Sequence, residues 1–276
     1  MSRQRPQLQG RVAIIKTIRQ LAHRRSVWDV WRDWLEMCAL SLRNAVDRDA
    51  GWQEREDRYL AVVKGYDRDE VESLCRCFAD LVDAMTVEPG DVLGSIFMEL
   101  ELGNANMGQF FTPYEVCKMM ASMTLADGKA QQAIERRGYV TMQEPACGGG
   151  AMIIAMAEEM RRLGMNPQQQ LHVTAVDLDI KAVHMAYIQL VLLHIPAVIV
   201  YGNALTLEER DHWYTPAHIL GGWSWRLRAG HNEKSGAQFP DNETMPDSAP
   251  ANDNTPTEVP MVSQEQVAVG QSFSLF

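Results

Sequence analysis

Apolar side chains recur at helical spacing through most of the first ninety residues. The clearest repeat follows Ser26, which is placed to cap a helix that runs to about Asp47. The same spacing predicts further helices over residues 10–23, 52–63 and 67–85. Pro89 and Gly90 then break the pattern. The first part of the chain is therefore predicted to be a helical N-terminal region over residues 1–90.

Three tryptophans lie on the expected helix that follows Ser26. Trp28, Trp31 and Trp34 have the spacing i, i+3, i+6, so their side chains lie near one face. An exposed face of this kind could stack nucleic-acid bases, whereas a buried one belongs to the protein core. Because the other positions on this face are also apolar, we favour the core.

Beyond residue 90 the pattern alternates between strands and helices. Asp91 is placed to cap one helix, and Thr112 is placed to cap another with Pro113 in its first position. Apolar runs then predict strands at residues 140–144, 171–176 and 197–201, separated by helices at 150–163 and 180–194. No confident strand is expected after Leu207. The alternation predicts an α/β domain over residues 91–228, with a partial Rossmann-like sheet.

The first expected strand ends in a turn that contains three glycines. Glu144 and Pro145 close the strand, because proline cannot donate to a sheet. Gly148, Gly149 and Gly150 then let a ligand approach the backbone, and the next helix points its N-terminal amides at the turn. The spacing differs from Gly-x-Gly-x-x-Gly, so the dinucleotide fingerprint is not met. A nucleotide-like ligand is expected here, with a plain surface loop as the alternative.

The next two expected strands also end in polar side chains. Asp177 lies at the tip of the second strand, where a carboxylate can accept hydrogen bonds from both hydroxyls of a ribose. The alternative role, capping the following helix, suits Asp179 better. Asn203 follows the third strand and is expected at the same edge of the sheet.

Charge is distributed unevenly along a chain whose net charge is -10. This net charge argues against non-specific nucleic-acid binding by the whole surface. Residues 232–276 carry seven acids and one lysine, whereas residues 1–28 carry seven basic side chains and no acid. The basic side chains are those of Arg3, Arg5, Arg11, Lys16, Arg19, Arg24 and Arg25. The asymmetry predicts either a polyanion bound by this N-terminal arm or shielding of the arm by the tail.

The composition of residues 229–276 predicts a disordered acidic tail, because it is rich in Asn, Asp, Ser, Pro, Thr and Gln. Its last four residues, Phe273 to Phe276, could be a docking peptide, with a segment that has no binding role as the more common alternative. The five cysteines have no Cys-x-x-Cys spacing, so we expect no disulfide framework, no metal site and a reducing, cytoplasmic setting. The longest apolar run, residues 190–201, is too short to cross a bilayer, and no signal peptide is expected.

Three motifs occur in an order that is typical of one enzyme family. They are Gly108-Gln109-Phe110-Phe111-Thr112-Pro113, then Glu144-Pro145-Ala146-Cys147-Gly148-Gly149-Gly150, then Asp177. Together they resemble the N6-adenine DNA methyltransferases of the gamma class, found in modification subunits of type I restriction systems. Glu144 replaces the family's Asp, and Gly149 replaces its Ser. The resemblance extends over roughly residues 91–206.

The resemblance implies S-adenosylmethionine as cofactor and adenine in DNA as substrate. It implies that Glu144 meets the ammonium group of the cofactor, Asp177 its ribose and Asn203 its adenine. The cofactor-binding residues that it implies are Phe110, Thr112, Pro113, Glu144, Pro145, Ala146, Gly148, Gly150, Asp177 and Asn203.

The family's catalytic tetrapeptide, Asn/Asp-Pro-Pro-Tyr/Phe, does not occur between Leu205 and Phe276. Tyr214 and Asp211 are the nearest substitutes, although their spacing differs from that of the family. Two functions therefore stay open. The chain is either a small N6-adenine DNA methyltransferase, with or without a partner subunit, or a catalytically silent relative. The silent relative would bind S-adenosylmethionine and DNA as a regulatory or restriction-modification accessory module. In both, DNA is expected at the basic N-terminal arm.

Overall fold

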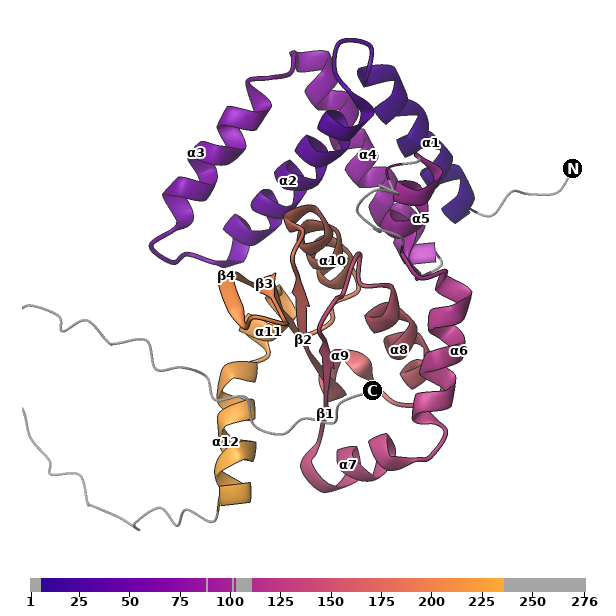
Figure 1. Cartoon of the computed structure of the whole chain (residues 1–276), viewed down its shortest axis with the longest axis vertical. Coiled ribbons are helices and arrows are strands. Elements are labelled where there is room, and N and C mark those ends of the chain that lie inside the picture. The colour runs from indigo at the N-terminus through magenta and orange to yellow at the C-terminus, as the bar shows by residue number, and fades with distance from the viewer. Residues whose placement is uncertain (1–5, 88, 101, 103–110, 236–276) are drawn as a thin grey trace, which may run out of the picture.

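The structure is a computed structural model that describes residues 6–87, 89–100, 102 and 111–235. The regular elements of the first half, as far as its residues are described, are the helices α1 (Pro6–Leu21), α2 (Val27–Val46), α3 (Trp52–Val63), α4 (Arg68–Val87), α5 (Val92–Glu99), α6 (Tyr114–Leu125) and α7 (Lys129–Arg137). Strands and helices then follow in the order β1 (Val140–Glu144), α8 (Ala151–Arg162), α9 (Pro167–Gln170), β2 (Leu171–Asp177), α10 (Ile180–Leu192), β3 (Ala197–Asn203), β4 (Glu208–Tyr214), α11 (Pro216–Leu220) and α12 (Trp223–Ser235). Figure 1 shows this order, with α1 to α5 grouped above the sheet.

A four-stranded sheet lies at the centre of the second half, in the order β1-β2-β3-β4. β1, β2 and β3 are parallel, and β4 is antiparallel to β3. Because the parallel strands share a direction, their last residues, Glu144, Asp177 and Asn203, lie at one edge of the sheet. We call this the carboxyl edge. The α/β fold with a partial Rossmann-like sheet is thereby confirmed.

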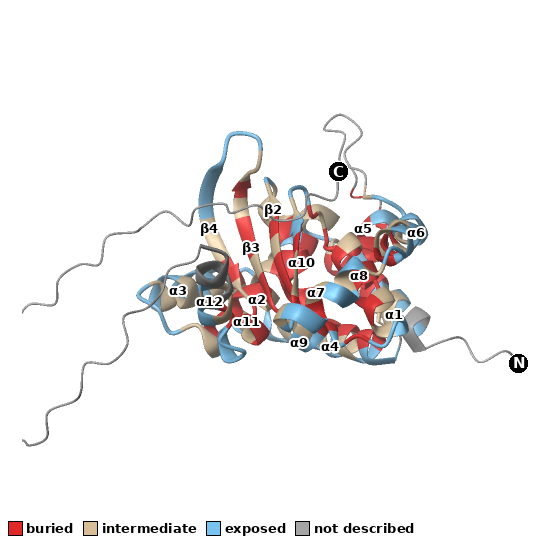
Figure 2. Cartoon of the chain, turned by 90° about the horizontal axis from the view of Figure 1, so that it is seen from below, coloured by how far each residue is buried: buried red, intermediate tan, exposed pale blue. Residues whose placement is uncertain are grey.

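The strand β4 corrects the expectation that no strand follows Leu207. Its first residues are charged and exposed, and Trp213 is its one buried residue. Figure 2 shows this contrast between the exposed start of β4 and the buried β3. Charged side chains are typical of edge strands, where they discourage pairing with other chains. The alternation of apolar and polar residues that predicts a strand is absent for this reason.

Two predicted boundaries also differ from the structure. Pro113, not Thr112, occupies the cap position of α6, and no side chain caps this helix. α12 continues to Ser235, so it extends into residues 229–276, where a disordered tail was expected. Residues 236–276 lie outside the described residues.

Tryptophans of α2 hold the helical region together. Trp31 is 0% exposed and Trp34 is 1% exposed, so the core prediction is confirmed for these two, whereas Trp28 is partly buried against the core. The indole of Trp34 donates a hydrogen bond to the Leu74 carbonyl at 3.1 Å, which ties α2 to α4. Ser26 caps α2 as predicted, because its side chain accepts from the Asp29 amide.

The helical region also packs against the α/β half. α10 contacts β2 and β3, and it contacts α2 as well. At the end of α2, the Arg43 guanidinium donates to the Asp211 carboxylate of β4 at 2.8 Å. Arg43 also lies 4.6 Å from the ring centre of Trp213. These contacts join the two parts through one side of the sheet.

Candidate functional site

The glycine turn follows β1 directly and is held against β2. The Cys147 amide donates to the Val176 carbonyl at 2.9 Å. Gly148 and Gly150 have φ angles of 52° and 92°, which residues with a Cβ atom rarely adopt. A Cβ atom on Gly148 would lie 2.9 Å from the ring of Phe111. Glycine is therefore required both by the backbone and by the close approach of this ring.

Two carboxyl groups flank the glycine turn. Asp177 accepts hydrogen bonds from the amides of Gly148 at 2.8 Å and Asp179 at 2.9 Å. Burial raises the pKa of Asp177, and burial together with the negative charge of Asp177 raises the pKa of Glu144. Neither carboxylate forms a salt bridge with any described residue. The carboxyl edge therefore carries negative charge that no described cation neutralises.

Asn203 ends β3, but its amide oxygen is engaged in the turn that leads to β4. The oxygen accepts from the Leu205 amide at 3.0 Å and from the Thr206 amide at 3.3 Å. The resemblance assigns this oxygen to an adenine amino group. The sequence does not reveal the competing role, because the turn exists only through the unpredicted strand β4.

A buried polar network supports the turn from the α10 side. The Gln189 amide donates to the Gly149 carbonyl at 2.7 Å and to Asp91 at 2.9 Å. Its oxygen accepts from the Leu93 amide at 3.0 Å. Asp91 caps α5 through the Gly94 amide, and burial raises the pKa of Asp91. The sequence identifies Asp91 as a cap but misses Gln189, which lies in an otherwise apolar stretch.

An aromatic row connects the turn with the helical region. The ring centres of Phe111 and Phe97 are 4.7 Å apart, and those of Phe97 and Trp28 are 5.8 Å apart. Phe111 belongs to the resemblance motif but is not among the cofactor residues that the resemblance implies. Phe110, which is among them, lies outside the described residues.

Four other expected cofactor residues lie at the same edge of the sheet. Thr112 and Pro113 are exposed immediately before α6. Pro145 and Ala146 are exposed in the turn after β1, where the Ala146 amide donates to Glu144 at 3.4 Å. Their exposure leaves this side of the turn accessible.

The two catalytic candidates do not lie beside the turn. Tyr214 pairs with Val198 near the start of β3, whereas Asn203 ends that strand. Val198 and Asn203 are five positions apart along β3, which is about 16 Å. Asp211 is bonded to Arg43. The structure therefore argues against Tyr214 as a clamp for a base at the carboxyl edge and gives Asp211 a structural partner.

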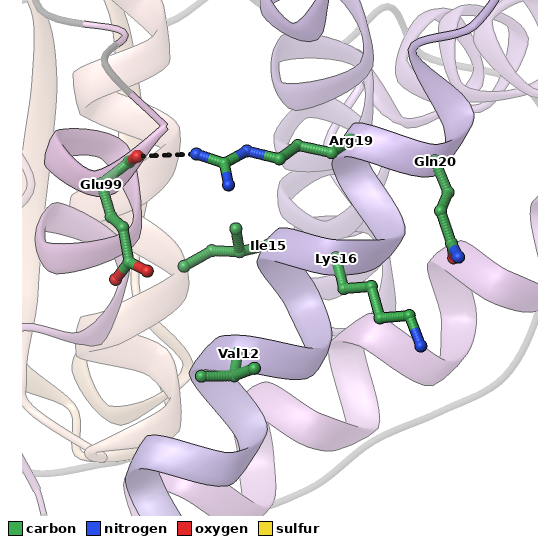
Figure 3. A pocket seen from close by; sticks show the side chains of 6 residues that line it. All are labelled: Val12, Ile15, Lys16, Arg19, Gln20 and Glu99. Atoms are coloured by element: carbon green, nitrogen blue, oxygen red, sulfur yellow. Dashed lines mark hydrogen bonds between the residues drawn. The ribbon is translucent and has the colours of Figure 1, made fainter.

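The basic N-terminal arm is partly neutralised within the fold. Arg11 pairs with Glu99 at 3.3 Å, and Arg25 pairs with Glu70 at 3.1 Å. Arg19 donates to the backbone carbonyl of Glu99 at 3.2 Å, as Figure 3 shows. These acceptors lie 45 to 88 residues away in the sequence, so composition could not reveal them.

A hollow of about 410 Å³ lies along α1, between Val12, Lys16 and Glu99 (Figure 3). Lys16 and Arg24 form no salt bridge with any described residue, while Arg3 and Arg5 lie outside the described residues.

Among the described residues, no group of histidine, cysteine and acidic side chains could hold a metal ion. No described helix is long and apolar enough to cross a membrane.

Comparison with known proteins identifies the family. A solved structure from Listeria monocytogenes, described as a class I S-adenosylmethionine-dependent methyltransferase, is similar to this chain with a TM-score of 0.44 and 12% identity. The similarity covers 72% of this chain and 54% of that protein, so the chain spans about half of its length. No curated protein sequence matches the chain. The family model of N-6 DNA methylases matches residues 90–240, which is more than half of the chain. As its motifs predict, the chain belongs to the N-6 DNA methylase family.

Proposed function

We propose that the chain binds S-adenosylmethionine, the cofactor that its family implies, at the carboxyl edge. The observation that carries this proposal is the pair of carboxylates, Glu144 and Asp177, beside a glycine turn and without a described cationic partner. S-adenosylmethionine carries an ammonium group, a sulfonium group and two ribose hydroxyls. A cationic ligand with neighbouring hydroxyls matches an edge of this charge.

Both carboxylates at the edge have spare hydrogen-bonding capacity for such a ligand. An ionised carboxylate offers about four acceptor sites. Asp177 uses two of them for backbone amides and keeps others for ribose hydroxyls. Glu144 suits the ammonium group. The N-terminus of α8, which has no side-chain cap, suits the carboxylate of the cofactor. When bound, S-adenosylmethionine supplies a methyl group on its sulfonium.

We propose adenine in DNA as the target, in keeping with the family. Transfer to the adenine amino nitrogen needs an acceptor for the amino hydrogens and an aromatic clamp for the extruded base. Among the described residues, the oxygen of Asn203 is engaged in its turn. Tyr214 pairs with Val198 near the start of β3, far from the carboxyl edge. This observation favours the second function, a silent binding module, for the chain by itself. For methyl transfer to occur, a partner subunit would then have to supply the acceptor for the amino hydrogens and the aromatic clamp.

DNA is proposed to contact the arm through α1 and the turn that follows it. Lys16 and Arg24 carry charge without a described ion-pair partner, which favours phosphate contacts whose strength falls with added salt. A reducing, cytoplasmic compartment is proposed because the five cysteines are all free.

Two measurements on the full chain test these proposals in order. Isothermal calorimetry with S-adenosylmethionine and its demethylated product tests the cofactor, and absence of heat with both ligands in folded protein would refute it. Transfer of a labelled methyl group to mixed-sequence DNA, with and without host extract, tests the chemistry. Binding without transfer by the purified chain supports the silent module. Robust N6-methyladenine formation by the purified chain supports the enzyme.

A further inference from the structure

A second hollow, also of about 410 Å³, lies at the other end of the sheet from the glycine turn. Its walls come from the end of β4, from α11 and α12, and from Val46 and Asp47 at the C-terminal end of α2. Tyr214, which lines it, pairs with Val198 near the start of β3. The hollow is therefore separate from the candidate cofactor site.

The helices α11 and α12 meet at an exposed apolar corner beside this hollow. Leu220 is 77% exposed, Trp225 is 72% exposed and Ile219 is 37% exposed. Ile219 and Trp225 line the hollow together with the buried Trp223. Adjoining apolar side chains on a surface indicate a site of interaction, and tryptophan is enriched among the residues that dominate interfaces. We call Ile219, Leu220, Trp223 and Trp225 the α11–α12 corner.

Basic side chains flank the α11–α12 corner. Arg228 lines the hollow, and the guanidinium of Arg226 lies 3.7 Å from the ring centre of Trp223. Asp47 also lines the hollow, but it is paired with Arg43 at 3.3 Å. The corner thus suits an apolar segment whose neighbouring residues carry negative charge.

The C-terminal segment of the same chain has this character. Six of the ten residues 267–276 are apolar, including Phe273 and Phe276. Residues 236–266 before them carry six acids and no base. The segment follows α12 in the sequence, and the first turns of α12 line the hollow. Thirty-one intervening residues reach up to about 100 Å when extended, so length does not prevent a return.

We propose that residues 267–276 dock on the α11–α12 corner of their own chain. Phe273 and Phe276 cover Ile219 and Trp225, while the preceding acids approach Arg228. Because the segment is tethered, the contact is intramolecular and needs only weak intrinsic affinity. The docked segment covers the apolar corner and leaves the carboxyl edge open, so this inference does not depend on the proposed function.

Photo-crosslinking of the full chain tests the proposal. A photoreactive phenylalanine analogue replaces Phe273, and the dilute protein is irradiated and mapped by mass spectrometry. We expect crosslinks within the monomer that concentrate on α11 and α12. The double variant Leu220→Ser, Trp225→Ala should lower their yield at least fivefold. Leu205→Ser is the matched control, because Leu205 is 95% exposed at the other end of the sheet and its loss should change nothing.

Other crosslinking outcomes would overturn the proposal. Crosslinks between two chains would identify a second copy as the occupant, and crosslinks centred on Lys16 would place the tail on the basic arm. Even scatter over the surface would exclude docking. Hydrogen exchange gives a second measurement without the analogue. The variant Phe273→Ser, Phe276→Ser should exchange faster than the unaltered chain in α11 and α12, and equal rates would contradict the proposal.

Discussion

The two ends of the parallel strands use polar residues in opposite ways. At the amino end, His172 and His218 share a hydrogen bond of 2.8 Å, and His218 continues to Ser224 at 2.9 Å. Thr215 bonds to the backbone of Ile195 and Ala197. These groups satisfy one another, as stable interiors require. At the carboxyl edge the carboxylates keep unused acceptor capacity and lack a described cation.

The contrast separates residues that hold the fold from residues that await a ligand. Burial alone does not separate them, because it shifts pKa values at both ends. It lowers the pKa of His172 to about 3 and that of His218 to about 4, and it raises that of Asp177. Unused hydrogen-bonding capacity beside a glycine turn is the distinguishing sign. Changes at the two ends should therefore have different consequences.

The largest expected effect comes from the network that supports the glycine turn. Gln189→Ala removes hydrogen bonds to Asp91, Gly149 and Leu93, all at a fully buried side chain. Each unsatisfied buried group costs about 1–3 kcal/mol. We expect the free energy of unfolding, measured with urea, to fall by about 3 kcal/mol or more.

Gln131→Ala is the matched control for this change. Gln131 is exposed on α7 and bonds only to the neighbouring Glu135 among the described residues. Its loss should change the free energy of unfolding by no more than about 0.5 kcal/mol. Equal effects of the two substitutions would show that the network does not support the turn.

The network also marks the limit of what the sequence can predict. The strand ends, the glycine turn and the cap at Ser26 are signalled by residues close together in the chain, and the structure contains all of them. Gln189 acts on Asp91 from 98 positions away, and no local pattern encodes that pairing. The engagement of Asn203 was missed for a related reason, since β4 forms from charged residues without strand periodicity.

The second largest effect should fall on cofactor affinity. Asp177→Asn keeps the size of the side chain but removes the negative charge, and charge-assisted hydrogen bonds are worth about 1.5–3 kcal/mol each. We expect calorimetry to give roughly ten- to hundredfold weaker binding of S-adenosylmethionine. Asp211→Asn, a change at a carboxylate paired with Arg43, should leave the affinity unaltered. Equal losses in both variants would remove the distinction between the two carboxylates.

The histidines of the amino end predict how stability depends on pH. Their folded pKa values are about 3 for His172 and about 4 for His218, below the ordinary value of 6.5. Between pH 6.5 and these folded pKa values, the unfolded chain binds more protons than the folded chain does. The free energy of unfolding therefore decreases through both histidines as pH falls below 6.5. We expect His218→Asn to be less stable than the unaltered chain at pH 7.5.

The difference between the two proteins should shrink steadily as pH falls from 6.5 toward 4. Urea unfolding at several pH values measures it. Taking the difference removes the opposite contribution of carboxyls such as Asp91, whose raised pKa acts in both proteins. A difference that stays constant with pH would show that His218 titrates normally. Cofactor affinity at pH 7.5 should be the same in both, because His218 belongs to the amino end.

The smallest expected effect concerns the α1 surface, which belongs to neither end of the sheet. Lys16 has no salt-bridge partner among the described residues, so Lys16→Gln should remove one phosphate contact. We expect DNA affinity to fall uniformly across sequences and the salt slope to decrease by about 1. Lys129→Gln is the matched control, since Lys129 is exposed but paired with Asp127 at 2.8 Å. Fluorescence anisotropy with labelled DNA at several salt concentrations gives both slopes. A cation that contacts a phosphate releases counterions from the DNA, so losing it must change the salt slope. Identical slopes for the two variants and the unaltered chain would therefore show that Lys16 on α1 does not contact DNA.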